Sequence, residues 1–223
     1  GKIGNYEEVS REDDARMITL LGPGGFGKTR LALQASADLV DRFDGVFWIP
    51  LAPLTSEDRL ISALADSIGV GFYRGEDPFQ KVLEVLADRR CLLVFDNFEH
   101  LTSGRHFVAR LLKSTQARVL VTSREALRVP EEKVVEVTGL RSPERPDDPL
   151  FEEHGATQLF ISSLARAGRV TPLSPEERGP FVALCAQLHG MPLGIEMSAA
   201  LTINHGLPEV VSQIRERIDF LAV

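Results

Sequence analysis

The sequence has few of the features that mark secreted or membrane proteins. It contains 2 cysteines in 223 residues, and none of its apolar runs approaches the length of a membrane span. Two cysteines cannot build the disulfide framework of a small secreted protein, and both lie in apolar surroundings typical of buried thiols. The N-terminus also lacks the apolar stretch of a signal peptide. We therefore expect a soluble protein of the cytoplasm, without membrane contact.

Acidic residues outnumber basic ones. Lysine and arginine number 25 against 32 acidic residues, which gives a formal net charge of −7. A free-standing nucleic-acid-binding domain usually presents a basic face, so we expect no direct nucleic-acid contact from this segment. The hydrophobic content of 43% supports a substantial core, and the length fits one large domain or two small ones.

Residues 22–29 carry the clearest chemical signal. They read Gly-Pro-Gly-Gly-Phe-Gly-Lys-Thr, which has the spacing of a phosphate-binding loop. Glycines allow backbone N–H groups to converge on a polyphosphate, while Lys28 supplies positive charge and the Thr29 hydroxyl can bind Mg²⁺. The predicted nucleotide-binding residues here are Gly22, Pro23, Gly24, Gly25, Phe26, Gly27, Lys28, Thr29 and Arg30.

The surroundings of this loop support the assignment. The apolar run 17–21 predicts a buried strand, and Leu31, Ala32, Ala35 and Leu39 follow helical spacing. Strands and helices then alternate along the chain. The further expected strands are 46–51, 91–95, 118–122 and 133–137, and the helices between them begin near 55, 78 and 102. This alternation predicts an α/β fold, a P-loop NTPase with a five-stranded parallel sheet.

The composition changes after residue 140. Residues 141–149 contain three prolines and several charges, which is typical of a linker, and the remaining periodicity is helical. We expect a nucleotide-binding domain over 1–140, a linker over 141–149, and a subdomain of four short helices over 150–223. Within it, Ser174 begins a capping box with Glu177, and the helix after Pro192 is expected to run to Ala200.

An acidic residue ends the most apolar strand. Asp96 follows the run 91–95 and is placed to hold Mg²⁺, partly through water. Asn97 stands where many NTPases carry a second acid, but an amide cannot accept the proton of an attacking water. Glu99 either substitutes for that acid or is a solvated capping residue, and His100 is more typical of a surface or capping histidine.

Two further residues have open interpretations. Arg124 directly follows the fourth expected strand, so it either contacts a γ-phosphate or pairs on the surface with Glu125 or another carboxylate. Pro192, within Gly-Met-Pro-Leu at 190–193, is by itself only a helix break.

Four stretches in order resemble the STAND class of signal-transduction ATPases, in its NB-ARC or AP-ATPase branch. They are residues 22–32, 92–101, 119–124 and 188–193. The sequence Asp-Asn-Phe-Glu-His at 96–100 most resembles that of bacterial multidomain transcriptional regulators. Two features depart from the family: residues 3–8 carry only a degenerate Gly-Arg-Glu motif, with Asn5 in the arginine position, and no winged-helix domain follows. We expect an excerpt of a longer protein or a trimmed relative.

The resemblance implies roles for individual residues. Lys28 and Thr29 would bind phosphate and Mg²⁺, Asp96 would be the Walker B acid, Arg124 the sensor arginine, and Pro192 would pack on adenine. Family members are switches that hold ADP when closed, exchange it for ATP, self-associate when open, and hydrolyse ATP slowly. Effector and output domains would lie outside this chain.

Three functions are therefore compared. The first is a regulatory ATP/ADP switch with weak ATPase activity, in which Lys28, Asp96, Asn97 and Arg124 form the catalytic set. The second is a nucleotide-gated interaction module with negligible hydrolysis, which Asn97 favours over a fast ATPase. The third, a P-loop kinase, normally needs an arginine-rich lid, and here the arginines after the fourth strand are scattered among prolines and acids.

Overall fold

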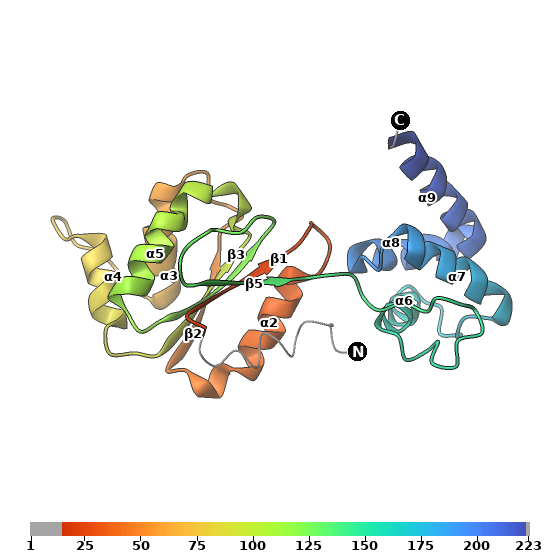
Figure 1. The fold of residues 1–223 in the computed structure, drawn as a ribbon, viewed down its shortest axis with the longest axis horizontal. Coiled ribbons are helices and arrows are strands. Elements are labelled where there is room, and N and C mark those ends of the chain that lie inside the picture. Colours follow the sequence, from red (N-terminus) through yellow and green to blue (C-terminus); the bar gives the residue numbers. More distant parts are fainter. Residues whose placement is uncertain (1–14, 222–223) are drawn as a thin grey trace. The chain divides into compact units, whose positions relative to one another are not determined.

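The chain contains two compact units. A computed structural model describes residues 15–221, and Figure 1 shows a unit built on a sheet and a unit built of helices. The α/β unit comprises the described residues up to Gly24 and Lys28–Val137, and the helical unit contains Gly25–Gly27 together with the chain from Thr138 onward. The degenerate motif at 3–8 lies outside the described residues.

The α/β unit contains a five-stranded sheet whose pairs are all parallel. The strands follow the order β2-β3-β4-β1-β5 across the sheet. Their bounds are β1 Met17–Leu21, β2 Gly45–Pro50, β3 Cys91–Asp96, β4 Arg118–Ser123 and β5 Glu132–Glu136. The predicted five-stranded parallel sheet is therefore confirmed, with strand ends within one residue of the expected positions.

The strand register brings three chain segments to one edge of the sheet. Leu21 lies opposite Ser123, and Phe95 lies opposite Val121, so β1, β3 and β4 end close together. The Gly22 N–H donates to the Ser123 carbonyl at 3.2 Å, which ties the start of the loop to the end of β4. Ligands of open parallel sheets bind beyond the carboxyl ends of the strands.

Helices follow the strands of this unit. They are α2 Lys28–Asp38, α3 Leu60–Ile68, α4 Pro78–Leu86 and α5 Arg105–Ser114, with short 3-10 turns at η1 Val40–Arg42, η2 Glu57–Arg59, η3 Phe98–His100 and η4 Thr102–Gly104. Asp77 caps α4 by accepting from the Phe79 N–H at 2.9 Å. The helix expected to begin near residue 55 is preceded by the tighter turn η2, and the Ser56 side chain makes no capping bond. The helix expected from residue 102 likewise begins as η4.

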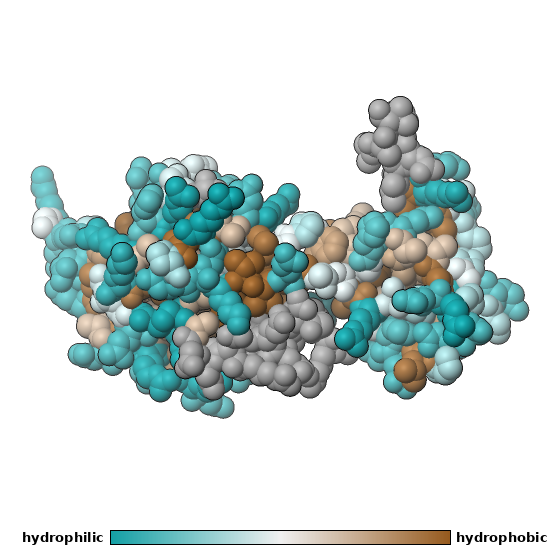
Figure 2. Space-filling model, in the orientation of Figure 1, coloured by the Kyte–Doolittle hydropathy of each residue, from teal (hydrophilic) through white to brown (hydrophobic). Residues whose placement is uncertain are grey.

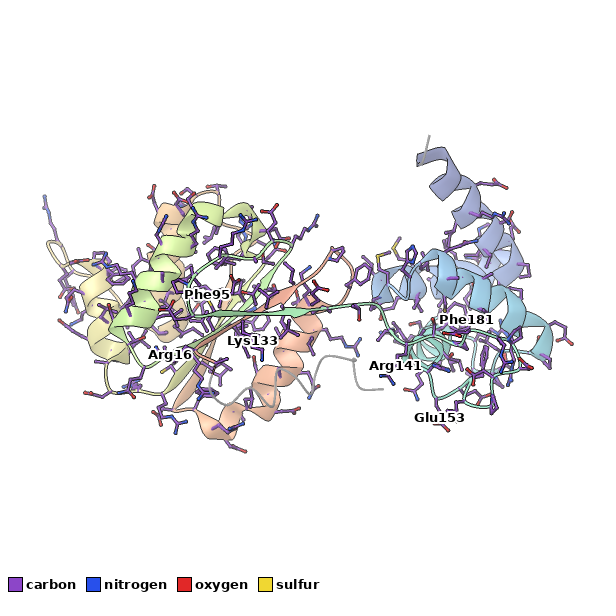
Figure 3. All side chains as sticks on the ribbon, in the orientation of Figure 1. Arg16, Phe95, Lys133, Arg141, Glu153 and Phe181 are labelled. Atoms are coloured by element: carbon purple, nitrogen blue, oxygen red, sulfur yellow. The ribbon has the colours of Figure 1, made fainter. Side chains whose placement is uncertain are left out.

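The core of this unit lies between the sheet and its helices. Phe95, labelled in Figure 3, is fully buried and meets Phe98 edge to face, with ring centroids 6.2 Å apart. Arg16 fastens the start of β1 to the end of α5, because its Nη2 donates to the carbonyls of Leu112 at 2.9 Å and Thr115 at 2.7 Å. Hydrophilic side chains cover much of the visible face of each unit (Figure 2).

The helical unit contains α6 Gly155–Arg166, α7 Pro175–Gln187, α8 Pro192–His205 and α9 Leu207–Leu221. Its core includes Phe160 and Phe181, of which Phe181 is labelled in Figure 3, and their ring centroids lie 4.9 Å apart. The predicted capping box is present, and the Glu177 carboxylate accepts from the Ser174 N–H at 2.9 Å. The expected end of α8 at Ala200 is wrong, because the helix continues to a glycine at 206 with φ of 73°.

Within residues 15–221, none of the helices combines the length and the apolar character that crossing a membrane requires.

Candidate nucleotide-binding site

The loop after β1 has a backbone that requires glycine. Gly25 and Gly27 have φ of 82° and 85°, in the left-handed region that side chains disfavour. At Gly24 a Cβ atom would lie 3.0 Å from Arg124 Nη2, and at Gly22 it would lie 2.8 Å from the Val137 carbonyl oxygen. The glycines therefore permit both the curvature of the loop and the close approach of its neighbours.

Lys28 folds back across this loop. Its Nζ donates to the carbonyl of Gly22 at 2.7 Å and to that of Pro23 at 2.9 Å. Partial burial lowers the pKa of Lys28 and nearby Arg124 lowers it further, while the carboxylates of Glu99 and Asp96 oppose that shift. The ammonium thus lies against the loop at the start of α2. A bound anion would be stabilised there both by this positive charge and by the helix dipole.

Asp96 joins the end of β3 to two threonine hydroxyls. Its Oδ1 accepts from Thr29 Oγ1 at 2.8 Å and from Thr122 Oγ1 at 2.6 Å. Thr122 in turn accepts from the Asn97 N–H at 2.9 Å. Sequence reasoning missed Thr122, although a threonine directly after the apolar residues 119–121 was a signal that could have identified it.

These oxygens are suited to Mg²⁺ only in part. No group of three histidine, cysteine or acidic side chains able to hold a metal occurs among the described residues. Mg²⁺, however, commonly uses one or two protein oxygens and completes its octahedron with water and substrate phosphates. The adjacent oxygens of Thr29 and Asp96 fit that mode of binding, and they do not fit an all-protein metal cage.

The chain turns sharply after Asp96. Asn97 adopts left-handed angles, φ 71° and ψ 53°, which asparagine tolerates better than most residues. The following turn, η3, buries Phe98. His100 Nε2 lies 3.1 Å from the Leu51 carbonyl and 3.0 Å from the Leu54 carbonyl, so it carries the proton and donates to them. His100 therefore holds the segment after β2 in place, and the residue itself is exposed.

Arg124 forms an ion pair with Glu99. Arg124 Nε lies 3.1 Å from Glu99 Oε1, and the side chains are 62% and 18% exposed. The second oxygen, Oε2, is buried and has no hydrogen-bond partner among the described residues. Of the two expected alternatives, pairing with a carboxylate occurs, but with Glu99 rather than Glu125. The Nη2 nitrogen of Arg124 lies beside Gly24, so the expected contact with a γ-phosphate stays a prediction.

The remaining predicted residues make smaller contributions to the geometry. Pro23 and Arg30 are exposed, and Phe26 is partly buried. Pro192 is the first residue of α8 in the helical unit, directly after a turn in which His189 and Gly190 both have positive φ. The Leu140 N–H donates to the Gly190 carbonyl at 2.8 Å, which holds this turn in place. The expected contact of Pro192 with adenine stays a prediction.

A pocket of about 550 Å³ opens beside these groups in the α/β unit. Arg124 and Phe98 contribute to its wall, and so does Arg105 at the start of α5. Arg105 was not predicted, because its distance in sequence from the strand ends gave no indication that α5 begins at this edge. The α/β unit thus gathers the first residues of the glycine loop, a lysine, two hydroxyls, a carboxylate and a guanidinium at one edge of a parallel sheet.

Comparison with known proteins agrees with this arrangement. Residues 5–144 match the family model described as the NB-ARC domain. An uncharacterized protein of Mycobacterium tuberculosis is 29% identical over the whole of this chain, which spans 55% of that protein. A second protein of that species, whose name provisionally assigns it to the HTH-type transcriptional regulators, is 32% identical over 83% of this chain and 20% of its own length. The chain thus spans about half the length of the first of these relatives, and less of the second.

Solved structures share the fold. A STAND protein with a tetratricopeptide repeat sensor from Pyrococcus horikoshii aligns over 96% of this chain and 32% of its own, with a TM-score of 0.55 and 19% identity. AMPPCP-bound DnaA from Aquifex aeolicus aligns over 98% of this chain and 68% of its own, with a TM-score of 0.53 and 13% identity. At these identities the likeness concerns the fold.

Proposed function

Because the chain belongs to the NB-ARC family, we propose that it binds ATP or ADP with Mg²⁺ and works as a slow regulatory ATPase switch. The observation that carries the proposal is the convergence of Lys28, Thr29, Asp96 and Arg124 beside the glycine loop. A polyphosphate requires positive charge and backbone donors, and Mg²⁺ requires oxygen ligands, and both sets occur at this edge.

Lys28 is the principal phosphate ligand in this proposal. In the structure its ammonium donates to two carbonyls of its own loop. A bound nucleotide would offer phosphate oxygens instead, which form stronger charge-assisted bonds than neutral carbonyls. The N–H groups of the loop residues 22–27 and the first turn of α2 would supply the remaining donors, with Arg30 at the helix surface.

Thr29 and Asp96 would hold Mg²⁺, the carboxylate partly through water. The ion neutralises charge that develops on the phosphates when it is bound. Thr122 orients the Asp96 carboxylate, because the short bond between them fixes one carboxylate oxygen. Arg124 would contact the γ-phosphate through its terminal nitrogens.

Hydrolysis is proposed to be slow for a chemical reason. Asn97 can hold a water but cannot take its proton, and Glu99 already accepts from Arg124. Without a dedicated base, the site would retain nucleotide long enough to report which one is bound. The same observation supports the second candidate, an interaction module with negligible hydrolysis. A P-loop kinase is the weakest candidate, because the arginines after β4 are scattered among prolines and acids and do not form a cluster typical of a lid.

The wider role rests on the family and the relatives. We assign residues 1–140 to a nucleotide-binding domain, 141–149 to a linker and 150–223 to a helical subdomain, from which Pro192 would pack on adenine. The likeness to an HTH-type regulator supports a role in transcription or signalling in the cytoplasm, with self-association in the ATP state. Effector and output domains, including any that contacts DNA, would be separate from this acidic segment.

A lysine substitution tests the site directly. Lys28→Ala should weaken ADP binding in calorimetry by about 10- to 100-fold, because a charge-assisted bond contributes roughly 1.5–3 kcal/mol. Lys113→Ala, at an exposed position in the last turn of α5, is the matched control and should bind as the parent does. Equal ADP affinity in Lys28→Ala and the parent would show that the site is wrongly assigned.

The switch is tested by nucleotide content and turnover. Chromatography of nucleotide released from denatured, purified protein should detect ADP. ATP turnover should fall below the range of about 1–100 s⁻¹ that is typical of kinases. Turnover within that range would contradict the switch and favour a catalytic enzyme.

A further inference from the structure

We propose that Glu99 is a positioning residue that directs Arg124 toward the γ-phosphate, and thereby sets the preference of the site for nucleoside triphosphate over diphosphate. This inference rests on the proposed nucleotide site. It concerns a residue that the sequence left undecided between a catalytic acid and a capping side chain.

The geometry of the guanidinium supports this role. Glu99 Oε1 engages Arg124 through Nε, at 3.1 Å, and leaves both terminal nitrogens uncommitted to this bond. Because the guanidinium is a rigid plane, fixing Nε also fixes the direction of those nitrogens. Nη2 lies against Gly24, close enough that a Cβ there would stand 3.0 Å away. The free side of Arg124 is therefore held over the phosphate loop.

Glu99 is itself held firmly on both sides. Before it, the Asn97 N–H donates to Thr122, and Phe98 is 1% exposed. After it, His100 donates to the two carbonyls near the end of β2. Arg124, by contrast, is 62% exposed and would lose rotamer freedom on meeting a phosphate. A fixed carboxylate reduces that loss before the nucleotide arrives.

The negative charge of Glu99 allows positioning of Arg124 to be distinguished from simple electrostatic repulsion. A carboxylate beside Lys28 opposes the binding of an anion, and more strongly for a triphosphate than for a diphosphate. Electrostatic repulsion alone therefore predicts that removing Glu99 favours ATP. The positioning role predicts that removing Glu99 disfavours ATP. Without Glu99 to orient it, Arg124 would bind the γ-phosphate less well, and ADP lacks that phosphate.

The experiment measures nucleotide preference by calorimetry on the full chain with Mg²⁺. The quantity is the dissociation constant of ADP divided by that of a non-hydrolysable ATP analogue. Glu99→Ala should lower this ratio by about three- to fivefold, the range of a partly exposed ion pair. Glu99→Gln should retain most of the preference, since its amide oxygen still accepts from Nε. Glu125→Ala is the control, because it removes an exposed carboxylate beside the same arginine.

The double variant isolates the connection to Arg124. Arg124→Ala should lower the ratio, and adding Glu99→Ala should lower it no further. Glu99→Asp keeps the charge but shortens the side chain, so it should behave as Glu99→Ala and serves if the alanine variant does not fold. An unchanged or increased ratio in Glu99→Ala, or an equal fall without Arg124, would overturn the proposal. A Glu99→Ala variant that loses ATP turnover but keeps the parental ratio would also overturn it, because Glu99 would then act on the attacking water and not on Arg124. A parent chain that binds neither nucleotide would overturn the proposed function itself.

Discussion

Thr122 donates a 2.6 Å hydrogen bond from β4 to Asp96 at the end of the neighbouring strand β3. The same hydroxyl accepts from the Asn97 N–H, so one buried side chain fixes both the carboxylate and the backbone that follows it. The proposed magnesium ligand is therefore oriented by a residue of a different strand.

Replacing Thr122 by valine should destabilise the protein. Valine preserves the shape but leaves the Asn97 N–H and one Asp96 oxygen without this partner, which costs about 1–3 kcal/mol when a buried polar group is unsatisfied. Urea unfolding followed by circular dichroism measures the change. The Mg²⁺ dependence of nucleotide affinity should weaken as well, and a variant with parental stability and affinity would contradict the orienting role.

Thr19 provides the opposite case on the adjacent strand β1. It is fully buried, and its Oγ1 has no hydrogen-bond partner among the described residues. Thr19→Val removes an unsatisfied hydroxyl without changing the volume much, so the free energy of unfolding should stay equal or rise by up to about 1 kcal/mol. The same urea titration compares this variant with Thr122→Val. An equal loss of unfolding free energy in both would show that the hydrogen bonds of Thr122 do not account for its effect on stability.

An ion pair in the helical unit should make stability depend on pH. Arg169 donates to both oxygens of Glu177, at 2.7 and 2.6 Å, and this bond lowers the pKa of Glu177 from its ordinary value of 4.5. A lowered carboxyl pKa stabilises the fold above the unfolded value, and that contribution is lost as the pH falls through the folded value. Glu177→Gln should therefore cost about 1–3 kcal/mol at pH 7 and progressively less below pH 4.5. Urea titrations at several pH values test this, and a difference independent of pH would contradict it.

The two cysteines should report on the two units separately. Cys91 and Cys185 are both free and 1% exposed, and burial raises the pKa of Cys185 to about 12. Because the thiolate is the reactive form, neither should react quickly with a thiol reagent in the folded protein at pH 8. Mass spectrometry after timed labelling at increasing urea should show Cys91 labelled as the α/β unit opens and Cys185 as the helical unit opens. Rapid labelling without urea would contradict the packing around that cysteine.

Much of the α/β unit was predictable because its signals are local. A short run with four apolar residues among five, a glycine loop and an amphipathic helix specify β1, the turn and α2 without reference to distant residues. The caps at Asp77 and Ser174 were predictable for the same reason. The helix starts near residues 55 and 102 were harder to predict, because a 3-10 turn and the first turn of an α-helix have the same sequence pattern.

The amino-acid sequence by itself determined the elements, the parallel sheet, and the places of Lys28, Thr29 and Asp96 at strand and helix ends, since each depends on spacing within a short segment. The tertiary structure alone decided which distant side chains meet. The pairing of Glu99 with Arg124, the bond from Thr122 to Asp96, and the place of Arg105 in the pocket wall follow from strand order and register. Those contacts arise when apolar faces are buried together, and no local pattern encodes the partner that burial brings near.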